Sequence, residues 1–365
     1  MSDGDNQEII ADEANRKAQD YSCPNCGAPV QYDPSKAVLH CEYCGYEGEI
    51  TGIHSCIEND FNAGKVDDSE WNKEAKVVHC DNCGANNVVD SGEISIRCPF
   101  CGSNQVVDTD ELAGIKPHRV IPFRISNQAA KDIYSKWLRK KFFVPKSVKR
   151  TILHLQLGGV YLPVWTFDTE TSSNYDGQLG KHYTRTVGTG KNARTVTEVR
   201  YFHIQGKKDV TFDDLIVNAG TKISQSEINA ISPFDTNNAY VYDKRYLAGF
   251  ASEHYVMRLE NGWTNAKNRI NTVVKNEILR GYSYDVVSYI HIQTLYHNIK
   301  YKYVLVPIWI GAFQFGQKSY RFIINGENGK ITGKTPISVI KVSLLVLLIL
   351  IVIIGVFLFA ITGDF

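Results

Sequence analysis

The chain has 365 residues, of which 43% are hydrophobic, and its 40 Lys and Arg nearly balance its 39 Asp and Glu. A chain of this length and hydrophobic content can form one or two domains, each with its own core. The first residues lack the apolar core of a secretory signal, and eight of the nine cysteines occur in close pairs, which argues against a secreted disulfide scaffold and for metal sites in a reducing compartment.

Composition and motif spacing predict an α+β fold, mainly antiparallel. The predicted parts are an acidic, disordered leader over 1–19, a zinc ribbon over 20–52, a linker over 53–76, a second zinc ribbon over 77–108, an α+β cytosolic domain with two related β units over 109–338, and one C-terminal transmembrane helix over 339–363.

The cysteines form two sets with the same spacing, the second 57 residues after the first, which indicates an internal duplication. Zn²⁺ accepts four thiolates tetrahedrally, and the glycine that follows each pair permits a tight turn around the metal. Four cysteines leave no open position for catalysis, so we predict two structural Zn²⁺ ions. The predicted ligands are Cys23, Cys26, Cys41 and Cys44 for the first ion, and Cys80, Cys83, Cys98 and Cys101 for the second. Cys56, in the linker, has no predicted pair.

Charge favours a protein partner for the ribbons. From Tyr21 to Val107 there are thirteen acidic and five basic residues, and two Zn²⁺ with eight thiolates make the balance more negative still. Nucleic-acid binding depends on neutralising phosphates with Lys and Arg, so nucleic acid is an unlikely partner. The opposite charge lies between Lys131 and Arg150, where eight basic residues face one acidic residue; this stretch is read as a solvated helix face, with anionic lipid or an acidic partner as the alternative.

Several elements of the α+β domain are predicted from local patterns. Ser126 is placed to cap a helix over 127–143, and residues 195–204 alternate as in a strand. Helical sequence is expected over 252–279, and 323–331 reads as a hairpin with a glycine-rich turn. The two related β units are proposed from an internal echo between Val160–Trp165 and Val304–Trp309.

No pattern predicts catalysis. Gly333-Lys334-Thr335 resembles the end of a phosphate loop, but the required earlier glycine is Asn328. The histidines of the domain occur singly, and Asp213-Asp214 is read as an acidic turn before a strand rather than as a metal-binding pair. The chain is therefore predicted not to be an enzyme.

Residues 342–363 carry no charge, and a helix of that length would extend roughly 33 Å, against a bilayer core of about 30 Å. Lys330, Lys334 and Lys341 precede this stretch. The sequence thus predicts a single-pass tail anchor in the cell membrane, with the N-terminal bulk on the cytoplasmic side.

The ordered set of motifs resembles a bacterial family of tail-anchored membrane proteins with two TFIIB-type zinc ribbons, often labelled primosomal helicase-like. The elements that carry the resemblance are the two cysteine units, Val120–Phe123, Gly159–Trp165, Leu305–Trp309, Asn325–Lys330 and the terminal apolar segment. The resemblance implies phage-shock-protein-A-like or flotillin-like (SPFH) envelope-stress proteins as partners. The sequence lacks the Walker motifs that a helicase requires.

The expected function is that of a membrane-anchored, zinc-binding adaptor or scaffold that recruits or assembles other proteins at the inner membrane face. The alternative is a nucleic-acid-binding zinc-ribbon protein related to replication or primosome factors.

Overall fold

The computed structural model describes residues 21–54, 57–62, 75–80, 85–90, 107–109, 115–145, 147–148, 157–190, 193–316 and 318–362. The helices are α2 (Asn127–Lys140), α4 (Gln225–Ile231), α5 (Leu259–Arg280), α6 (Val339–Thr362) and the 3-10 helix η3 (Lys244–Leu247). The strands are β1 (Tyr21–Ser22), β2 (Pro29–Asp33), β3 (Val38–His40), β4 (Glu47–Glu49), β5 (Asn59–Asp60), β6 (Ala75–His79), β7 (Asn86–Asp90), β8 (Val107–Thr109), β9 (Arg119–Val120), β10 (Gly158–Val187), β11 (Arg194–Asn218), β12 (Tyr240–Val241), β13 (Ala251–Glu253), β14 (Val286–Phe315), β15 (Lys318–Asn325) and β16 (Ile331–Gly333). The predicted leader over 1–19 lies outside the described residues.

The described strands form two sheets, as expected for an α+β fold. Strands β1 to β4 make a separate four-stranded sheet in the first ribbon, and the other strands make a twelve-stranded sheet. Most pairs are antiparallel; β10 with β13 and β14 with β9 are parallel. Within the predicted linker, β5 adds to the main sheet by pairing with β14.

The main sheet is organised by the pairing of β10 with β14. The two echoing segments lie side by side and antiparallel, with Val160 opposite Ile308 and Trp165 opposite Tyr303. Their side chains are buried on both faces, because one face joins an aromatic core and the other an aliphatic core. Burial on both faces explains why these segments are continuously apolar instead of alternating. The common origin of the two β units stays a prediction.

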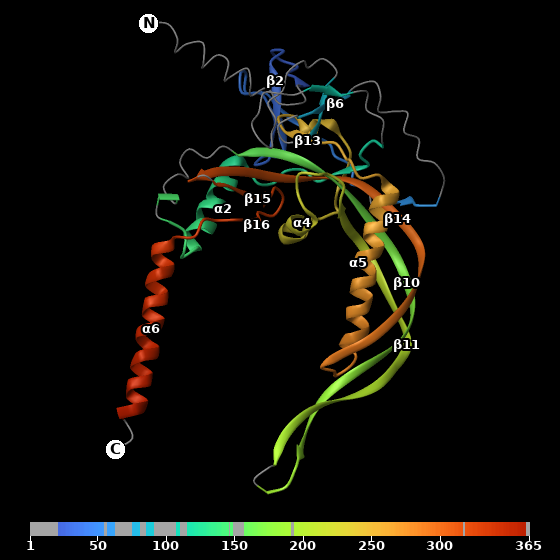
Figure 1. Cartoon of the computed structure of the whole chain (residues 1–365). Coiled ribbons are helices and arrows are strands. Elements are labelled where there is room, and N and C mark those ends of the chain that lie inside the picture. Colours follow the sequence, from blue (N-terminus) through green and yellow to red (C-terminus); the bar gives the residue numbers. More distant parts are fainter. Residues whose placement is uncertain are drawn as a thin grey trace.

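Beyond this crossing, three strands continue together as a long curved arm (Figure 1). We define the arm as residues 166–187 of β10, 194–216 of β11 and 286–302 of β14. Helix α5 lies along the concave side of the arm (Figure 1). The buried residues of α5 recur at helical spacing, as expected for a helix that packs one face onto a sheet: Leu259, Trp263, Ala266, Ile270, Val274 and Ile278.

Trp165 joins this helix to the sheet. Its side chain is fully buried and its Nε1 donates a hydrogen bond of 2.8 Å to the carbonyl of Met257, just before α5 begins. Gly262, in the first turns of α5, packs directly on the indole: a Cβ there would lie 2.8 Å from Trp165 Cδ1. Helix α5 and strand β10 therefore meet, just before the arm begins, at a contact that only glycine fits.

The local predictions in this domain are confirmed except at two helix ends. Helix α2 ends at Lys140 and not at residue 143, and the helix predicted over 252–279 begins only at Leu259, because the chain first forms strand β13. The Ser126 side chain caps α2 by accepting a hydrogen bond from Ala129 N, and Leu138 is among the helix residues buried against the sheet. β15 and β16 pair antiparallel, and the turn between them contains Gly329 at φ +78°. The strand predicted over 195–204 is part of β11.

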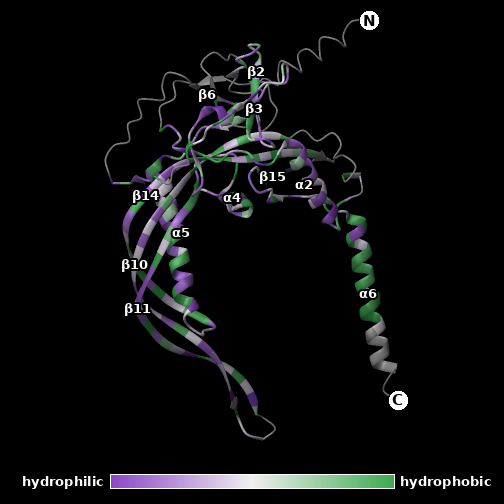
Figure 2. Cartoon of the chain, turned by 180° about the vertical axis from the view of Figure 1, so that it is seen from behind, coloured by the Kyte–Doolittle hydropathy of each residue, from purple (hydrophilic) through white to green (hydrophobic). Residues whose placement is uncertain are grey.

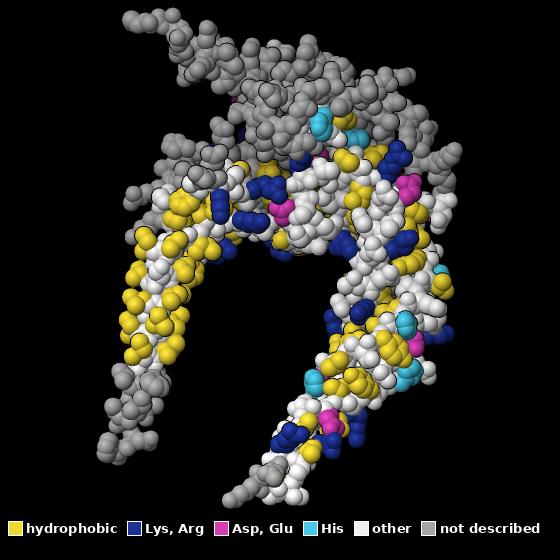
Figure 3. Space-filling view, in the orientation of Figure 1, with side chains coloured by type: hydrophobic (Ala, Val, Ile, Leu, Met, Phe, Trp, Pro, Cys, Tyr) yellow, Lys and Arg dark blue, Asp and Glu magenta, His cyan; other side chains and the backbone are white. Residues whose placement is uncertain are grey.

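The prediction of a membrane-spanning tail is corrected. The apolar segment does form a helix, α6, which stands apart from the arm with exposed apolar side chains (Figures 2 and 3). Among the described residues, no helix is both long and apolar enough to cross a membrane. The transmembrane helix predicted over 339–363, the tail anchor and the cell-membrane location are therefore not supported.

The contact between Gly262 and Trp165 gives a stability test. Alanine improves intrinsic helix propensity by up to about 1 kcal/mol. Overpacking against the hydrogen-bonded indole should cost about 1–3 kcal/mol, so we expect Gly262→Ala to lower the free energy of unfolding. Urea denaturation measures this change. The control is Asn261→Ala at the exposed preceding position, which should be neutral or stabilising; a Gly262→Ala variant as stable as this control would contradict the packing argument.

Candidate metal centre and the buried ion network

The first four predicted ligands come together at one end of the four-stranded ribbon sheet. Cys23 and Cys26 belong to the turn between β1 and β2, and Cys41 and Cys44 to the turn between β3 and β4. Both turns are closed in the same way. The first cysteine N–H donates to the carbonyl five residues later, at 2.6 Å for Cys23 to Ala28 and 2.9 Å for Cys41 to Tyr46. The glycine after each pair has positive φ, +75° at Gly27 and +73° at Gly45, which explains its presence in both turns.

The four sulfur atoms are spaced for one metal ion. Cys23 Sγ lies 3.4 Å from Cys44 Sγ, and Cys26 Sγ lies 3.6 Å from Cys41 Sγ. All four lie within 4.8 Å of one another. Metal–sulfur distances of about 2.3 Å in a tetrahedron place sulfurs about 3.8 Å apart. The cluster can therefore hold one tetrahedral metal ion.

Electrostatics favour metal binding at Cys41. The backbone N–H groups of Cys44 and Tyr43 point at this sulfur and lower the pKa of Cys41 to about 7, whereas the contact with the Cys23 sulfur and burial raise the pKa of Cys44. Thiolate is the form that binds a metal ion, so less free energy is needed to deprotonate Cys41 at neutral pH.

The ribbon is fixed to the main domain. Tyr32 N donates a 2.9 Å hydrogen bond to the carbonyl of Ala248, and its ring packs edge-on against Tyr246 with centroids 5.5 Å apart. Tyr32 is buried in the core that extends into the main sheet. Gly249, at φ +83°, lies against the side chain of Gln31. The metal centre thus sits on a structural support and not on a free-moving module.

Of the second predicted set, only Cys80 is described. It is fully buried, and its N–H donates a 2.8 Å hydrogen bond to the carbonyl of Ala85. This bond spans five residues, as in both turns of the first set. Cys83, Cys98 and Cys101, and also Cys56, lie outside the described residues.

A second cluster of charged residues lies at the base of the arm, and of its members the sequence analysis had considered only Asp214. Lys302 on β14 is almost completely buried, and its Nζ lies 2.6 Å from Asp214 Oδ1 and 3.2 Å from Glu58 Oε1. Asp168 on β10 accepts a hydrogen bond from Asp214 N and contacts the Glu58 carboxyl. Lys300 pairs with Glu58 at 3.3 Å from the more exposed side.

This ion network occupies an interruption of the sheet. The register of β10 shifts between Phe167 and Thr169 against β11, and between Asp168 and Glu170 against β14. Asp214 adopts φ +49° there. It therefore lies in an irregular part of β11, where the sequence had suggested a turn before a strand. The carboxylate atoms of Glu58, Asp168 and Asp213 lie within 4.8 Å of one another, but Lys302 supplies a fixed positive charge beside them.

Burial dominates the titration of Asp168. Desolvation, followed by the hydrogen bond with Glu58, raises the pKa of Asp168 to about 7. The pKa of Glu58 is lowered by its contacts with Asp168, Lys302 and Lys300, against the opposing effect of its own burial. Between the lowered pKa of Glu58 and about pH 7, the two carboxyls accordingly share one proton, which Asp168 holds.

Comparison with known proteins gives one relative. No family model matches the chain, and no solved structure matches it. A protein of Bacillus subtilis (strain 168) named "Uncharacterized protein YdjG" is 30% identical over 328 residues, which cover 88% of this chain and 92% of that protein. The similarity therefore extends over most of both chains and is not limited to one cysteine motif.

The metal centre predicts a loss of bound metal on ligand removal. We expect Cys41→Ser to remove one equivalent of metal per chain and to lower the melting temperature, because the ribbon is too small to fold on its own core. Elemental analysis of the purified protein measures the metal. Tyr43→Ser, in the same turn and 78% exposed, is the control that should keep the ion. Equal metal content in the two variants would refute the assignment of Cys41 as a ligand.

The ion network predicts a pH-dependent stability difference. Because the folded pKa of Asp168 is about 7 and its ordinary value is 3.8, the folded chain holds an extra proton between these values. The stability contribution of Asp168 therefore falls as pH rises from about 4 to 7. Asn mimics the protonated acid. As pH rises from about 4 to 7, the free energy of unfolding of Asp168→Asn should therefore increase by about 1–4 kcal/mol relative to that of the wild type.

Chemical denaturation of the variant and the wild type at several pH values measures this difference in unfolding free energy. The cysteine ligands titrate equally in both proteins, so their contribution cancels. Asp176→Asn, exposed on the same strand, should show no such trend. A difference between Asp168→Asn and the wild type that is constant with pH would contradict the shared proton.

Proposed function

The chain belongs to the same family as the YdjG protein of Bacillus subtilis, and on this premise we propose that it is a zinc-dependent, non-enzymatic scaffold that brings other proteins together. The observation that carries the proposal is the arm, a long, curved surface that projects from a core to which the ribbon with the four clustered cysteines is fixed.

The proposed metal is zinc, with one structural ion in each of two ribbons. A complete set of four thiolates suits Zn²⁺ and leaves no position open for substrate. For the second ion, the support is the repeated cysteine spacing and the hydrogen bond from Cys80 N to the Ala85 carbonyl, which matches the bonds that close both turns of the first ribbon.

The proposed contact surface is the side of the arm that faces away from α5, which we call the outer face. Side chains alternate across a strand, so the outer face collects every second residue of each strand. In register, Gln178 lies between His203 on β11 and Tyr289 on β14. The exposed aromatic, imidazole and aliphatic side chains of the outer face are Tyr201, His203, Tyr289, His291, Leu295 and His297.

The composition of the outer face is that of a protein-contact surface. Leu295 is 62% exposed and Tyr201 is 51% exposed, and Figure 3 shows hydrophobic and histidine side chains together along the arm. Tyrosine is enriched where proteins bind one another. Asp176 and Asp209, from β10 and β11, lie among these residues, so the surface lacks the uniform positive charge that a nucleic-acid backbone requires.

The non-enzymatic part of the proposal rests on how the polar groups are used. Lys302, the most buried charged side chain of the ion network, is engaged by two carboxylates. His118, another buried group with catalytic potential, accepts a hydrogen bond from Tyr303 N at 2.9 Å, and burial lowers its pKa to about 4. Both side chains are thus committed to holding backbone and strands in place.

The proposed partners are phage-shock-protein-A-like or flotillin-like (SPFH) proteins, as the sequence resemblance implied. The proposal does not place the complex in or beside a membrane. It requires only that a partner contacts the outer face while zinc keeps the ribbon folded.

Binding to these partners is the decisive test. Immobilised zinc-loaded protein should bind a phage-shock-protein-A-like or flotillin-like protein from the same genome, and Leu295→Asp should weaken binding at least tenfold by placing a charge in the contact. Asn276→Asp, at an exposed position of α5 away from the outer face, should bind like the wild type. Equal binding by both variants would exclude the outer face.

The alternative function, nucleic-acid binding, is tested separately. Filter binding of the same protein to DNA and RNA at two salt concentrations should show no tight complex. Tight, strongly salt-dependent binding would overturn the scaffold proposal in favour of a nucleic-acid-binding ribbon protein.

A further inference from the structure

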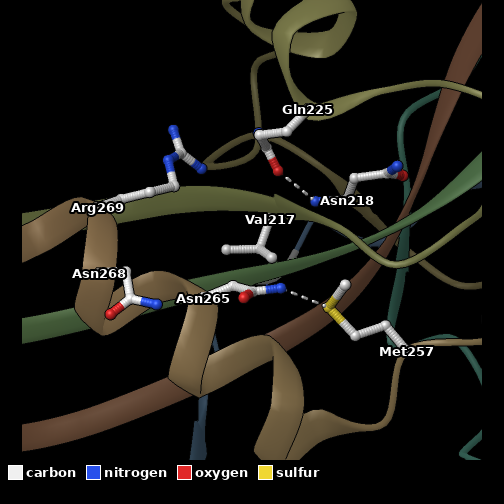
Figure 4. Close-up of a pocket in the computed structure, with 7 residues that line it drawn as sticks. All are labelled: Val217, Asn218, Gln225, Met257, Asn265, Asn268 and Arg269. Atoms are coloured by element: carbon white, nitrogen blue, oxygen red, sulfur yellow. Dashed lines mark hydrogen bonds between the residues drawn. The ribbon is translucent and has the colours of Figure 1, made fainter.

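A small pocket opens between α5, the end of β11 and the start of α4 (Figure 4). Its volume is about 360 Å³, within the usual range for small-molecule sites. The lining residues are Val217, Asn218, Gln225, Met257, Asn265, Asn268 and Arg269. It lies apart from the metal centre and from the outer face of the arm.

Arg269 is the only charged residue in the lining. Its Nη1 donates to the carbonyl of Ile216, and its Nη2 lies 3.4 Å from Asn229 Oδ1. Both acceptors are neutral. None of the ion pairs between described residues includes Arg269.

A half-buried guanidinium without a negative partner is in an unfavourable environment. Burial lowers the pKa of Arg269, which shows that its surroundings do not compensate the charge. Arginine nevertheless stays protonated in proteins, so the site carries a full positive charge with N–H groups to spare. An anion in the pocket would supply the missing compensation.

The amides of the pocket divide into two kinds. Gln225 and Asn218 are structural: the Gln225 side chain accepts from Asn218 N at 2.8 Å, and Asn218 Nδ2 donates to Gly220 O at 3.1 Å. Asn265 and Asn268 on α5 are far less engaged. Asn265 Nδ2 contacts only the sulfur of Met257, at 3.3 Å, and among the described contacts the Asn268 side chain has no hydrogen bond.

The available donors all come from α5, with the Arg269 guanidinium on the Gln225 side of Val217 and the amides of Asn265 and Asn268 on the other side (Figure 4). Asn265 and Arg269 are four residues apart and lie on one face of α5, with Asn268 beside them. Val217 and Met257 provide an apolar wall. The set combines a planar guanidinium, which binds carboxylates in bidentate fashion, with amide N–H donors and a surface for a short hydrocarbon group.

We propose that this pocket is a binding site for a small carboxylic acid, with the carboxylate on Arg269, a short apolar body against Val217 and Met257, and the amides of Asn265 and Asn268 lining the same pocket. The proposal goes beyond the scaffold function and does not depend on it. Because the pocket is open and the ligand small, the expected dissociation constant is about 0.1–5 mM.

The test titrates the metal-loaded full chain with isovalerate and, in parallel, with isovaleramide, which has the same shape without the charge. Saturation-transfer NMR and calorimetry should show saturable binding of isovalerate and at least tenfold weaker binding of the amide. Arg269→Gln should weaken isovalerate binding at least tenfold. Arg280→Gln, on the same helix with a side chain 75% exposed, should leave it unchanged.

A second variant guards against misfolding, since Arg269 also holds the Ile216 carbonyl. Asn268→Asp changes one exposed side chain and puts a negative charge in the pocket, so it should weaken isovalerate binding at least fivefold with an unchanged melting temperature. No saturable binding of isovalerate, or binding that Arg269→Gln and Asn268→Asp leave intact, would overturn the proposal. Inorganic phosphate that binds while isovalerate does not would overturn the assignment to carboxylic acids.

Discussion

The antiparallel pairing of β10 with β14 is the interaction on which the rest of the molecule depends. Where Val160–Trp165 lies against Val304–Trp309, both faces are covered and every side chain is buried. The aromatic face of this pairing receives the first ribbon, through Tyr32 and Tyr246, and α5, through Trp165. The ribbon, the helix and the arm are therefore positioned by one central contact.

The arm begins where the sheet is no longer covered on both faces. At the base of the arm, the register of β10 shifts and Asp214 has a positive φ. Here the buried position on β14 is taken by Lys302, paired with Asp214, instead of by an apolar side chain. A buried ion pair adds little stability over an apolar contact, but removing one partner is costly. We interpret the network as a device that fixes the register of β10, β11 and β14. Its partner Glu58 comes from the segment between the two ribbons.

What the sequence predicted correctly was local. The four cysteines of the first ribbon, the Ser126 cap and the alternation in β11 each follow from spacing within a short stretch. Lys302 was not predicted, because Lys300-Tyr301-Lys302-Tyr303 alternates as a half-exposed strand does, and only its distant partner Glu58 reveals the burial. The pocket at Arg269 combines three elements and has no local pattern. The apolar tail does form a helix, α6, as its sequence predicted, but no helix among the described residues is long and apolar enough to span a membrane.

The continuity of β10 and β11 has a mechanical consequence. From Thr166 to Val187 the two strands are paired with a single shift in register, over a contour of about 70 Å. An antiparallel ribbon of this length, backed by α5 along part of its course, resists bending far better than a loop of equal length. Such an element acts as a spacer of fixed length. Two molecules bound at its base and near its tip would be kept a fixed number of nanometres apart, even if the molecules themselves were flexible.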